Sequence, residues 1–144
     1  MRYYEDFEIG DVLETRRRTI TEADIVNFCG FSGDWYPLHS DVEYAEKSVF
    51  GERIAHGMLV LSVATGLLPL NEIAIVAFYG MDKVRFRVPT KIGDTLGLQV
   101  NITDKEDKGE MGGLVTFDMY VKNQKGEDAA VSIMKVMVAK KNGA

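Results

Sequence analysis

Residues 55–68 read AHGMLVLSVATGLL, form the longest apolar stretch of the chain, and are followed by Pro69. On a helix these side chains cover nearly the whole circumference, and a helix that is apolar all round is a buried one. The stretch is 14 residues long. That corresponds to about 21 Å at ~1.5 Å per residue, which is too short to span a bilayer. It predicts a helix in the hydrophobic core, and no membrane partner is expected.

The sequence after Pro69 has the pattern of β-strands. Apolar and polar residues alternate in several segments, and glycine-rich or charged turns separate them. The expected strands are residues 73–79, 83–88, 96–102, 115–121 and 134–138, with a first strand in residues 12–20. Helices and strands that do not interleave favour an α+β fold, here a curved antiparallel sheet wrapped around the buried helix. The open edges of such a sheet favour pairing with a second copy.

Shorter helices are expected before the buried one. Residues 21–24, TEAD, resemble a capping box with Asp in place of the usual Glu, and the helix that begins there should end between Gly30 and Gly33. Pro37 biases the residue before it away from the α region, so residues 31–39 are predicted to be an ordered, non-helical loop. A further helix is expected from Ser40, because residues 40–43, SDVE, form another capping box.

Composition sets limits on the function. With 144 residues, 46% hydrophobic and 27% charged, the chain has room for one domain, residues 1–144. The net charge of −5 makes nucleic acid an unexpected partner. Cys29 is the single cysteine, which predicts a small core residue and a reducing, cytoplasmic location. No cluster has metal-ligand spacing, no phosphate-binding glycine loop is present, and no serine or cysteine lies in a nucleophile motif.

Asp34 and His39 are the candidate acid/base pair. The chain has two histidines, and His39 follows Asp34 by five residues with Pro37 between them. A bent loop can point a carboxylate and an imidazole at one water molecule, and such a pair can take one proton and deliver another. Spacing alone leaves a second interpretation open, in which Asp34 caps a turn and His39 satisfies local backbone groups.

Gly57 is the candidate oxyanion site, at the start of the buried helix. The first N–H groups of a helix have no internal partners, and the helix dipole favours negative charge there. Glycine has no Cβ, so a ligand oxygen can approach its N–H closely. The alternative is that glycine serves only close packing of helix on sheet. His56 is interpreted as a helix-start residue outside the catalytic pair.

The motifs FSGDWYPLH at residues 31–39 and AHGM at residues 55–58 resemble the MaoC-like dehydratase family, also called (R)-specific enoyl-CoA hydratases. The opening FEIGD at residues 7–11 and the stretch VRFRVP at 84–89, followed by IGD at 92–94, also look like the family. The resemblance covers most of the chain. It implies a hot-dog fold, in which a long helix is wrapped by an antiparallel sheet, and a homodimer or a multimer of dimers joined through sheet edges.

The resemblance also implies a function. The substrate would be an acyl-CoA thioester, or a thioester of acyl carrier protein, within fatty acid metabolism, and no separate cofactor would be needed because coenzyme A belongs to the substrate. Water would add reversibly across the 2,3-double bond. Asp34 and His39 fall on the family's catalytic pair and Gly57 on its oxyanion-hole amide, with the choice of formal base left open. Tyr36, His56 and Met58 are the further candidates for substrate binding.

Tyr36 departs from the family pattern, which often has Asn at that position. This replacement leaves the identity of the acyl chain open. Two other functions stay possible on the sequence: an acyl-CoA thioesterase, and an acyl-thioester-binding protein without catalytic activity. The sequence fixes neither the physiological direction nor the assembly beyond a dimer.

Overall fold

The computed structural model describes residues 1–142, so the last two residues of the predicted domain, residues 1–144, lie outside the described range. The helices are η1 (Tyr4–Asp6), α1 (Glu22–Ser32), α2 (Pro37–Ser40), α3 (Val42–Glu46), α4 (Gly57–Leu67), η2 (Leu70–Glu72) and η3 (Gly109–Met111). The strands are β1 (Val12–Glu14), β2 (Arg18–Thr19), β3 (Ile75–Phe86), β4 (Thr95–Asp107), β5 (Gly113–Lys122) and β6 (Asp128–Val138).

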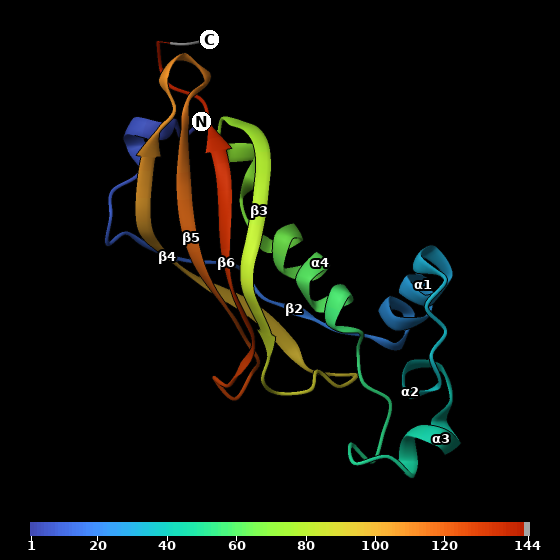
Figure 1. The fold of residues 1–144 in the computed structure, drawn as a ribbon. Helices are drawn as coiled ribbons and strands as arrows, with labels where there is room; N and C mark the ends of the chain where they lie inside the picture. Colours follow the sequence, from blue (N-terminus) through green and yellow to red (C-terminus); the bar gives the residue numbers. More distant parts are fainter. Residues whose placement is uncertain (143–144) are drawn as a thin grey trace.

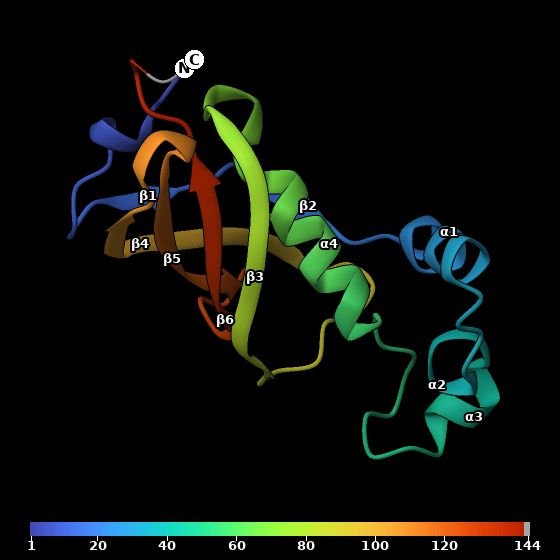
Figure 2. The same cartoon turned by 45° about the horizontal axis from the view of Figure 1, so that its top comes forward.

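The strands form one antiparallel sheet in the order β1-β4-β5-β6-β3, with β2 paired to the first two residues of β4 (Figure 1). The long strands β4, β5 and β6 alternate buried and less buried residues over 98–102, 117–122 and 130–136. The sheet curves around α4, which runs across its concave face (Figures 1 and 2). The predicted α+β architecture, the hot-dog fold, is confirmed.

The central helix is shorter than its apolar run, because residues 55 and 56 precede it and His56 is its N-cap. Its buried side chains are Leu59, Val60, Leu61, Val63, Ala64 and Leu67. Met58, Ser62 and Gly66 are exposed, and their spacing of four residues places them on one stripe. The prediction of a helix buried on all sides is therefore wrong for this stripe.

β3 replaces two predicted strands. Residues 73–79 and 83–88 were expected as separate segments, but one strand runs from Ile75 to Phe86 and pairs with β6 throughout. The register shifts at three places, including the step between Asp82 and Arg85, and Lys83 lies between them with φ 51°. Bulges let a strand continue through an irregular stretch while it bends, so four strands follow the helix and not five.

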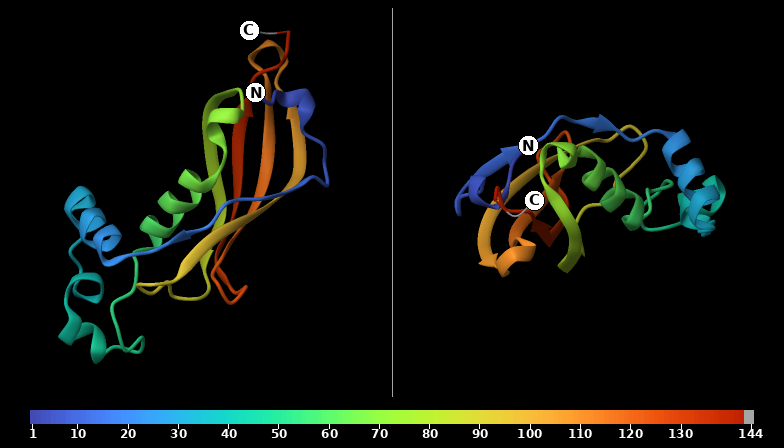
Figure 3. Two further views of the ribbon diagram at one scale, coloured as in Figure 1. Left: turned by 180° about the vertical axis from the view of Figure 1, so that it is seen from behind. Right: turned by 90° about the horizontal axis from the view of Figure 1, so that it is seen from above.

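Residues 22–54 lie beyond the N-terminal end of α4, away from the sheet (Figure 3). Thr21 caps α1 through the predicted capping box with Asp24, and Gly33 ends the helix in the left-handed conformation at φ 77°. Two local predictions are wrong: Pro37–Ser40 forms the one-turn helix α2, and Asp41 rather than Ser40 caps α3 through a 3.0 Å bond from the Tyr44 N–H. Proline is well placed at the first position of a helix, which explains α2.

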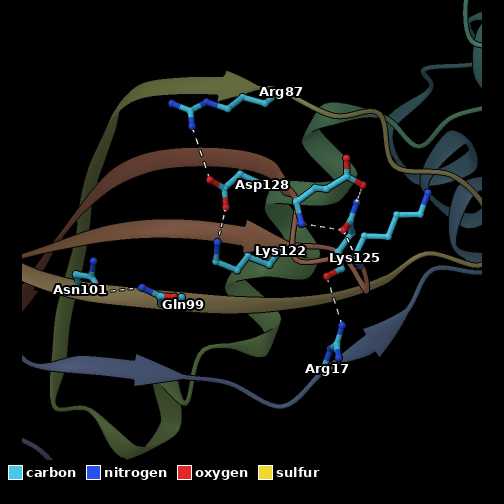
Figure 4. A network of polar contacts seen from close by, with 9 residues as sticks. Arg17, Arg87, Gln99, Asn101, Lys122, Lys125 and Asp128 are labelled. Atoms are coloured by element: carbon cyan, nitrogen blue, oxygen red, sulfur yellow. Dashed lines mark hydrogen bonds and ion pairs between the residues drawn. The ribbon is translucent and has the colours of Figure 1, made fainter.

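A polar network lies at the end of the sheet that holds the turn between β5 and β6 (Figure 4). Asp128 at the start of β6 accepts a 2.7 Å hydrogen bond from Lys122 of β5, and the Arg87 guanidinium lies 3.7 Å from the same carboxylate. Arg17 reaches the carbonyl of Asn123 at 3.4 Å. The Arg87–Asp128 contact ties the residue that follows β3 to the start of β6. Within residues 1–142, the helices fall short of the length and apolarity that a membrane span requires.

Candidate active site

Asp34 is positioned by the end of α1. The left-handed Gly33 turns the chain, and the backbone N–H of Asp34 donates to Ser32 Oγ at 3.1 Å. Asp34 Oδ1 in turn accepts the N–H of Tyr36 at 3.2 Å. This Asx turn holds the carboxylate over the segment that leads into α2. Both interpretations of Asp34 therefore have a basis, because it caps a turn and still presents an exposed carboxylate.

His39 is held from the opposite side by the chain that precedes α4. Its Nδ1 lies 2.7 Å from the carbonyl oxygen of Ile54. A carbonyl can only accept, so Nδ1 carries the proton. The other ring nitrogen, Nε2, is then left with a lone pair that can accept a proton. The Ile54 segment is itself fixed, since the N–H of Ala55 donates to the carbonyl of Thr90 at 2.8 Å.

Asp34, His39 and His56 converge. One carboxylate oxygen and one nitrogen of each ring lie within 4.8 Å of one another. Two polar atoms that each bond one water at about 2.8 Å can be as far apart as about 5.6 Å. The spacing of Asp34 and His39 therefore suits a shared water, which is what a hydration reaction needs.

The same three residues have the composition of a metal site, but their geometry does not suit one. The rings of His39 and His56 are stacked, with centroids 3.8 Å apart and planes at 26°. Stacked imidazoles direct their in-plane lone pairs side by side and not toward one point. One nitrogen of each ring is also committed to a backbone carbonyl. We therefore assign these residues no metal.

His56 lies behind His39 and is 2% exposed. Its Nε2 is 3.0 Å from the backbone carbonyl oxygen of Asp34 and 3.5 Å from Cys29 Sγ. The other ring that packs against His56 is Phe28, with the two ring centroids 4.8 Å apart. A residue so enclosed has no surface to offer to a substrate in this conformation.

Gly57 is the first residue of α4, so its N–H has no acceptor within the helix. The ring of Phe86, at the end of β3, packs directly on it. A Cβ at position 57 would lie 2.6 Å from Phe86 Cζ, closer than real side chains come. A side chain at position 57 would have to displace the Phe86 ring, so glycine permits this close packing. Glycine also has no side chain that could cover its own amide.

His39 and Gly57 line one cavity, with a volume of about 440 Å³. Most of its wall is apolar, and Arg87 is the cation among its lining residues. The remaining residues that contribute are Phe50, Ile54, Ala55, Met58, Val60, Phe86, Val88, Pro89, Thr90 and Ala129. An apolar cavity with a few polar groups at one end suits an acyl chain. A separate open groove of about 520 Å³ along α1 and α4 contains neither His39 nor Gly57.

The remaining predicted residues fall around this cavity. Met58 lines it. Tyr36 packs edge-on against His39, with centroids 6.2 Å apart, and its hydroxyl bonds that of Tyr44 at 3.2 Å. His39, Gly57 and Met58 thus line one cavity. Asp34 is outside the lining of this cavity and lies close to His39 and His56, and Tyr36 packs against His39.

Sequence reasoning missed three contributors. The Ile54 carbonyl orients His39, Phe86 packs on Gly57, and Arg87 brings a cation to the cavity wall. Ile54 and Phe86 act across 15 and 29 residues of sequence, and no local pattern marks such contacts. Arg87 has a local signal, because residues 83–88 alternate and place Lys83, Arg85 and Arg87 on one strand face. Such a face could meet phosphates, but the pattern favours a solvated face.

Cys29 is the nearest thiol to the site. Its side chain is buried, and burial raises the pKa of the Cys29 thiol, with the charge of Asp34 raising it further. A thiol of raised pKa carries little of the thiolate that acts as a nucleophile. The expectation that Cys29 is a core residue is confirmed, and its 3.5 Å contact with His56 does not make a Cys–His nucleophile.

Comparison with known proteins gives consistent results. Residues 6–123 match the family model of the MaoC like domain. Protein MaoC of Klebsiella aerogenes is 47% identical over 105 residues, which are 72% of this chain and 31% of that protein. The chain thus spans about a third of the length of this relative.

Two further similarities extend over most of the length of the similar protein. The (R)-specific enoyl-CoA hydratase of Rhodospirillum rubrum is 36% identical over 103 residues, 72% of this chain and 71% of that enzyme. The crystal structure of a monoamine oxidase regulatory protein from Archaeoglobus fulgidus is 39% identical, with a TM-score of 0.91 over 97% of this chain and 95% of that one.

Proposed function

This chain belongs to the MaoC-like domain family, and from that premise we propose that it is a hydratase/dehydratase of 2,3-unsaturated acyl thioesters. One observation carries the proposal. His39, with its Nε2 free to accept a proton, shares a cavity with the start of α4, and an Asp34 oxygen lies within 4.8 Å of the His39 ring. The relatives that bear the hydratase name support the same reaction class.

In this proposal, Asp34 and His39 bind one water between them. His39 Nε2 takes a proton from it, because Nδ1 is already protonated and donates to Ile54. The water oxygen attacks C3 of the conjugated double bond, and the proton passes back to C2. The hydrogen bond from His39 to the Ile54 carbonyl stabilises the imidazolium that forms on the way. The elements of water add across C2 and C3, and the dehydration runs the same steps backwards.

Gly57 supplies the electrostatic part. Attack at C3 moves negative charge onto the thioester oxygen, and the Gly57 N–H at the helix N-terminus would donate to that oxygen. Phe86 and the other apolar residues of the cavity place apolar surface around this amide. A hydrogen bond to developing charge is stronger in such surroundings.

The same cavity supports the proposed substrate class. Its apolar wall suits an acyl chain, with coenzyme A as the carrier, acyl carrier protein as the alternative, and fatty acid metabolism as the setting. Tyr36 and Met58 stay candidates for contact with the chain. No separate cofactor is needed. The cytoplasmic location expected from the single cysteine stays a prediction.

A homodimer belongs to the proposal. β3 is an edge strand of the sheet and carries exposed apolar side chains at Val76, Phe78 and Tyr79. An open edge of this kind needs a partner, and two β3 strands can pair with each other. The apolar residues Phe31 and Val49 beyond α4, 91% and 96% exposed, extend the surface available to the second copy. Dimers can assemble further into larger multimers.

The test is an assay of purified protein with crotonyl-CoA and with branched and dicarboxylic enoyl-CoAs. Loss of the absorbance of the conjugated thioester, with formation of the 3-hydroxy product by mass spectrometry, is expected for at least one substrate. Free thiol is measured in the same samples. Thiol release without hydration would show a thioesterase, and tight binding without turnover across the panel would show a non-catalytic acyl-thioester-binding protein. Either result would remove the hydratase.

A further inference from the structure

His56 is fully enclosed, yet it is the buried polar group with the most direct contact to both candidate catalytic residues. Its ring stacks on His39 at 3.8 Å, and its Nε2 lies 3.0 Å from the carbonyl oxygen of Asp34. Phe28 and Cys29 of α1 close the other side. His56 therefore joins three segments: the end of α1, the α2 turn and the start of α4.

The hydrogen bonds define its tautomer. The Asp34 carbonyl can only accept, so Nε2 of His56 must carry a proton. Nδ1 of His56 is buried and has no hydrogen-bond partner among residues 1–142. A proton on this nitrogen would be a buried donor without an acceptor, which is costly. The neutral ring with its proton on Nε2 is the form that these surroundings accommodate.

The two histidines are thus opposite tautomers. His39 carries its proton on Nδ1 for the Ile54 carbonyl, and His56 carries it on Nε2 for the Asp34 carbonyl. An apolar residue at position 56 would leave no nitrogen unpaired, so packing alone does not account for a histidine there. The hydrogen bond to Asp34 and the stack on His39 do account for it.

We propose that His56 is a positioning residue, which donates to the Asp34 backbone and supports the His39 ring so that the two side chains meet at one water. The proposal rests on the proposed hydratase function and deepens it. His56 itself touches no substrate. Its loss should therefore lower kcat and leave KM nearly unchanged, because a displacement of about 1 Å in a reacting group can cost about 100-fold in rate.

Two variants separate the hydrogen bond from the packing. His56→Leu fills the buried space without a polar atom, and His56→Gln keeps an N–H donor at a similar distance from the backbone. We expect kcat for hydration of crotonyl-CoA to fall at least about tenfold in His56→Leu, with KM changed less than about threefold. His56→Gln should recover most of the loss. Cys29→Ala, which removes the other neighbour of Nε2, should keep the wild-type kcat.

Nuclear magnetic resonance of the same proteins tests the contact without any substrate. Long-range proton–nitrogen spectra of the wild type should show the two histidines as opposite tautomers, and the carbonyl carbon of Asp34 should shift in His56→Leu and return in His56→Gln. If the wild type hydrates no thioester, the proposed function is wrong. The spectra then still test the contact between His56 and Asp34. The role of His56 would be overturned if His39 and His56 were the same tautomer, or if a folded His56→Leu variant kept the wild-type kcat.

Discussion

The sheet with α4 and the segment of residues 22–54 have different roles in the molecule. The sheet and α4 contribute most of the buried apolar side chains, from Leu59 on the helix to Val138 on β6. The segment beyond α4 contributes few, and Phe31 and Val49 on it are almost fully exposed. Yet that segment carries Asp34 and His39. Stability is concentrated in one region and the candidate chemistry in the other, and the start of α4 is where they meet.

The sharpest test of this division is to change the chemistry and leave the scaffold. Asp34→Asn and His39→Gln should each lower the hydration rate at least ~100-fold, the usual lower range for a positioned acid/base group. Both side chains are outside the core, so the unfolding midpoint should stay within a few degrees of the wild type. Enzyme kinetics and thermal melts on the same preparations check this. Near-wild-type rates in both variants would remove the mechanism.

The converse test changes the scaffold and leaves the chemistry. Leu96 on β4 is fully buried in the core. Leu96→Ala should lower the free energy of unfolding by about 2–5 kcal/mol, through lost burial and the cavity left behind. The fraction that remains folded should keep a kcat close to wild type. Urea unfolding followed by circular dichroism gives the first value, and a large fall in kcat of folded protein would contradict the division.

The boundary between the two regions can be tested with two glycines of α4. Gly57→Ala places a Cβ against the ring of Phe86, which is half exposed and can swing toward the cavity. We expect kcat/KM to fall at least about tenfold with a stability change of about 1 kcal/mol. Adding Phe86→Leu should restore part of the activity.

Gly66→Ala is the matched control. Within residues 1–142 a Cβ at Gly66 meets no atom within 4 Å. Alanine is the better helix former, so this variant should gain about 0.5–1 kcal/mol in stability and keep its activity. Equal losses of activity in Gly57→Ala and Gly66→Ala would contradict the oxyanion role of Gly57.

The smallest expected effect lies on the surface of the scaffold. A hydrogen bond from Lys140 lowers the pKa of Asp107 below its usual 3.8, and the Gly109 N–H lowers it further. A carboxylate whose pKa is lowered in the folded state adds stability above its unfolded pKa and loses it as pH falls through the folded value. Lys140→Met should therefore be slightly less stable at pH 7, and the difference should shrink below about pH 4. Its kcat should equal the wild-type value at pH 7.

Local patterns account for what the sequence predicts well. The apolar run of residues 55–68, the Thr21 cap and the left-handed Gly33 each depend on neighbours along the chain, and each is confirmed. The sequence does not predict the helix at Pro37–Ser40, because proline disfavours helix in the residue before it and yet suits the first helical position itself. The sequence does not predict that β3 is one continuous strand, because its bulges disturb the alternation of apolar and polar residues near Lys83.

The candidate site divides in the same way. Asp34, His39 and Gly57 could be named from short motifs, because each motif is a continuous stretch. What orients them could not be named, because Ile54, Phe86 and His56 act through contacts across the fold. The distance between residues in the sequence, and not their chemical type, decided which parts of the site could be foreseen.

A crystal structure with bound 3-hydroxybutyryl-CoA tests the central claim most directly. We predict that the thioester oxygen lies within hydrogen-bond distance of the Gly57 N–H, and that the 3-hydroxyl oxygen lies between the Asp34 carboxylate and Nε2 of His39. An acyl group bound elsewhere, or a 3-hydroxyl beyond the reach of both side chains, would contradict it.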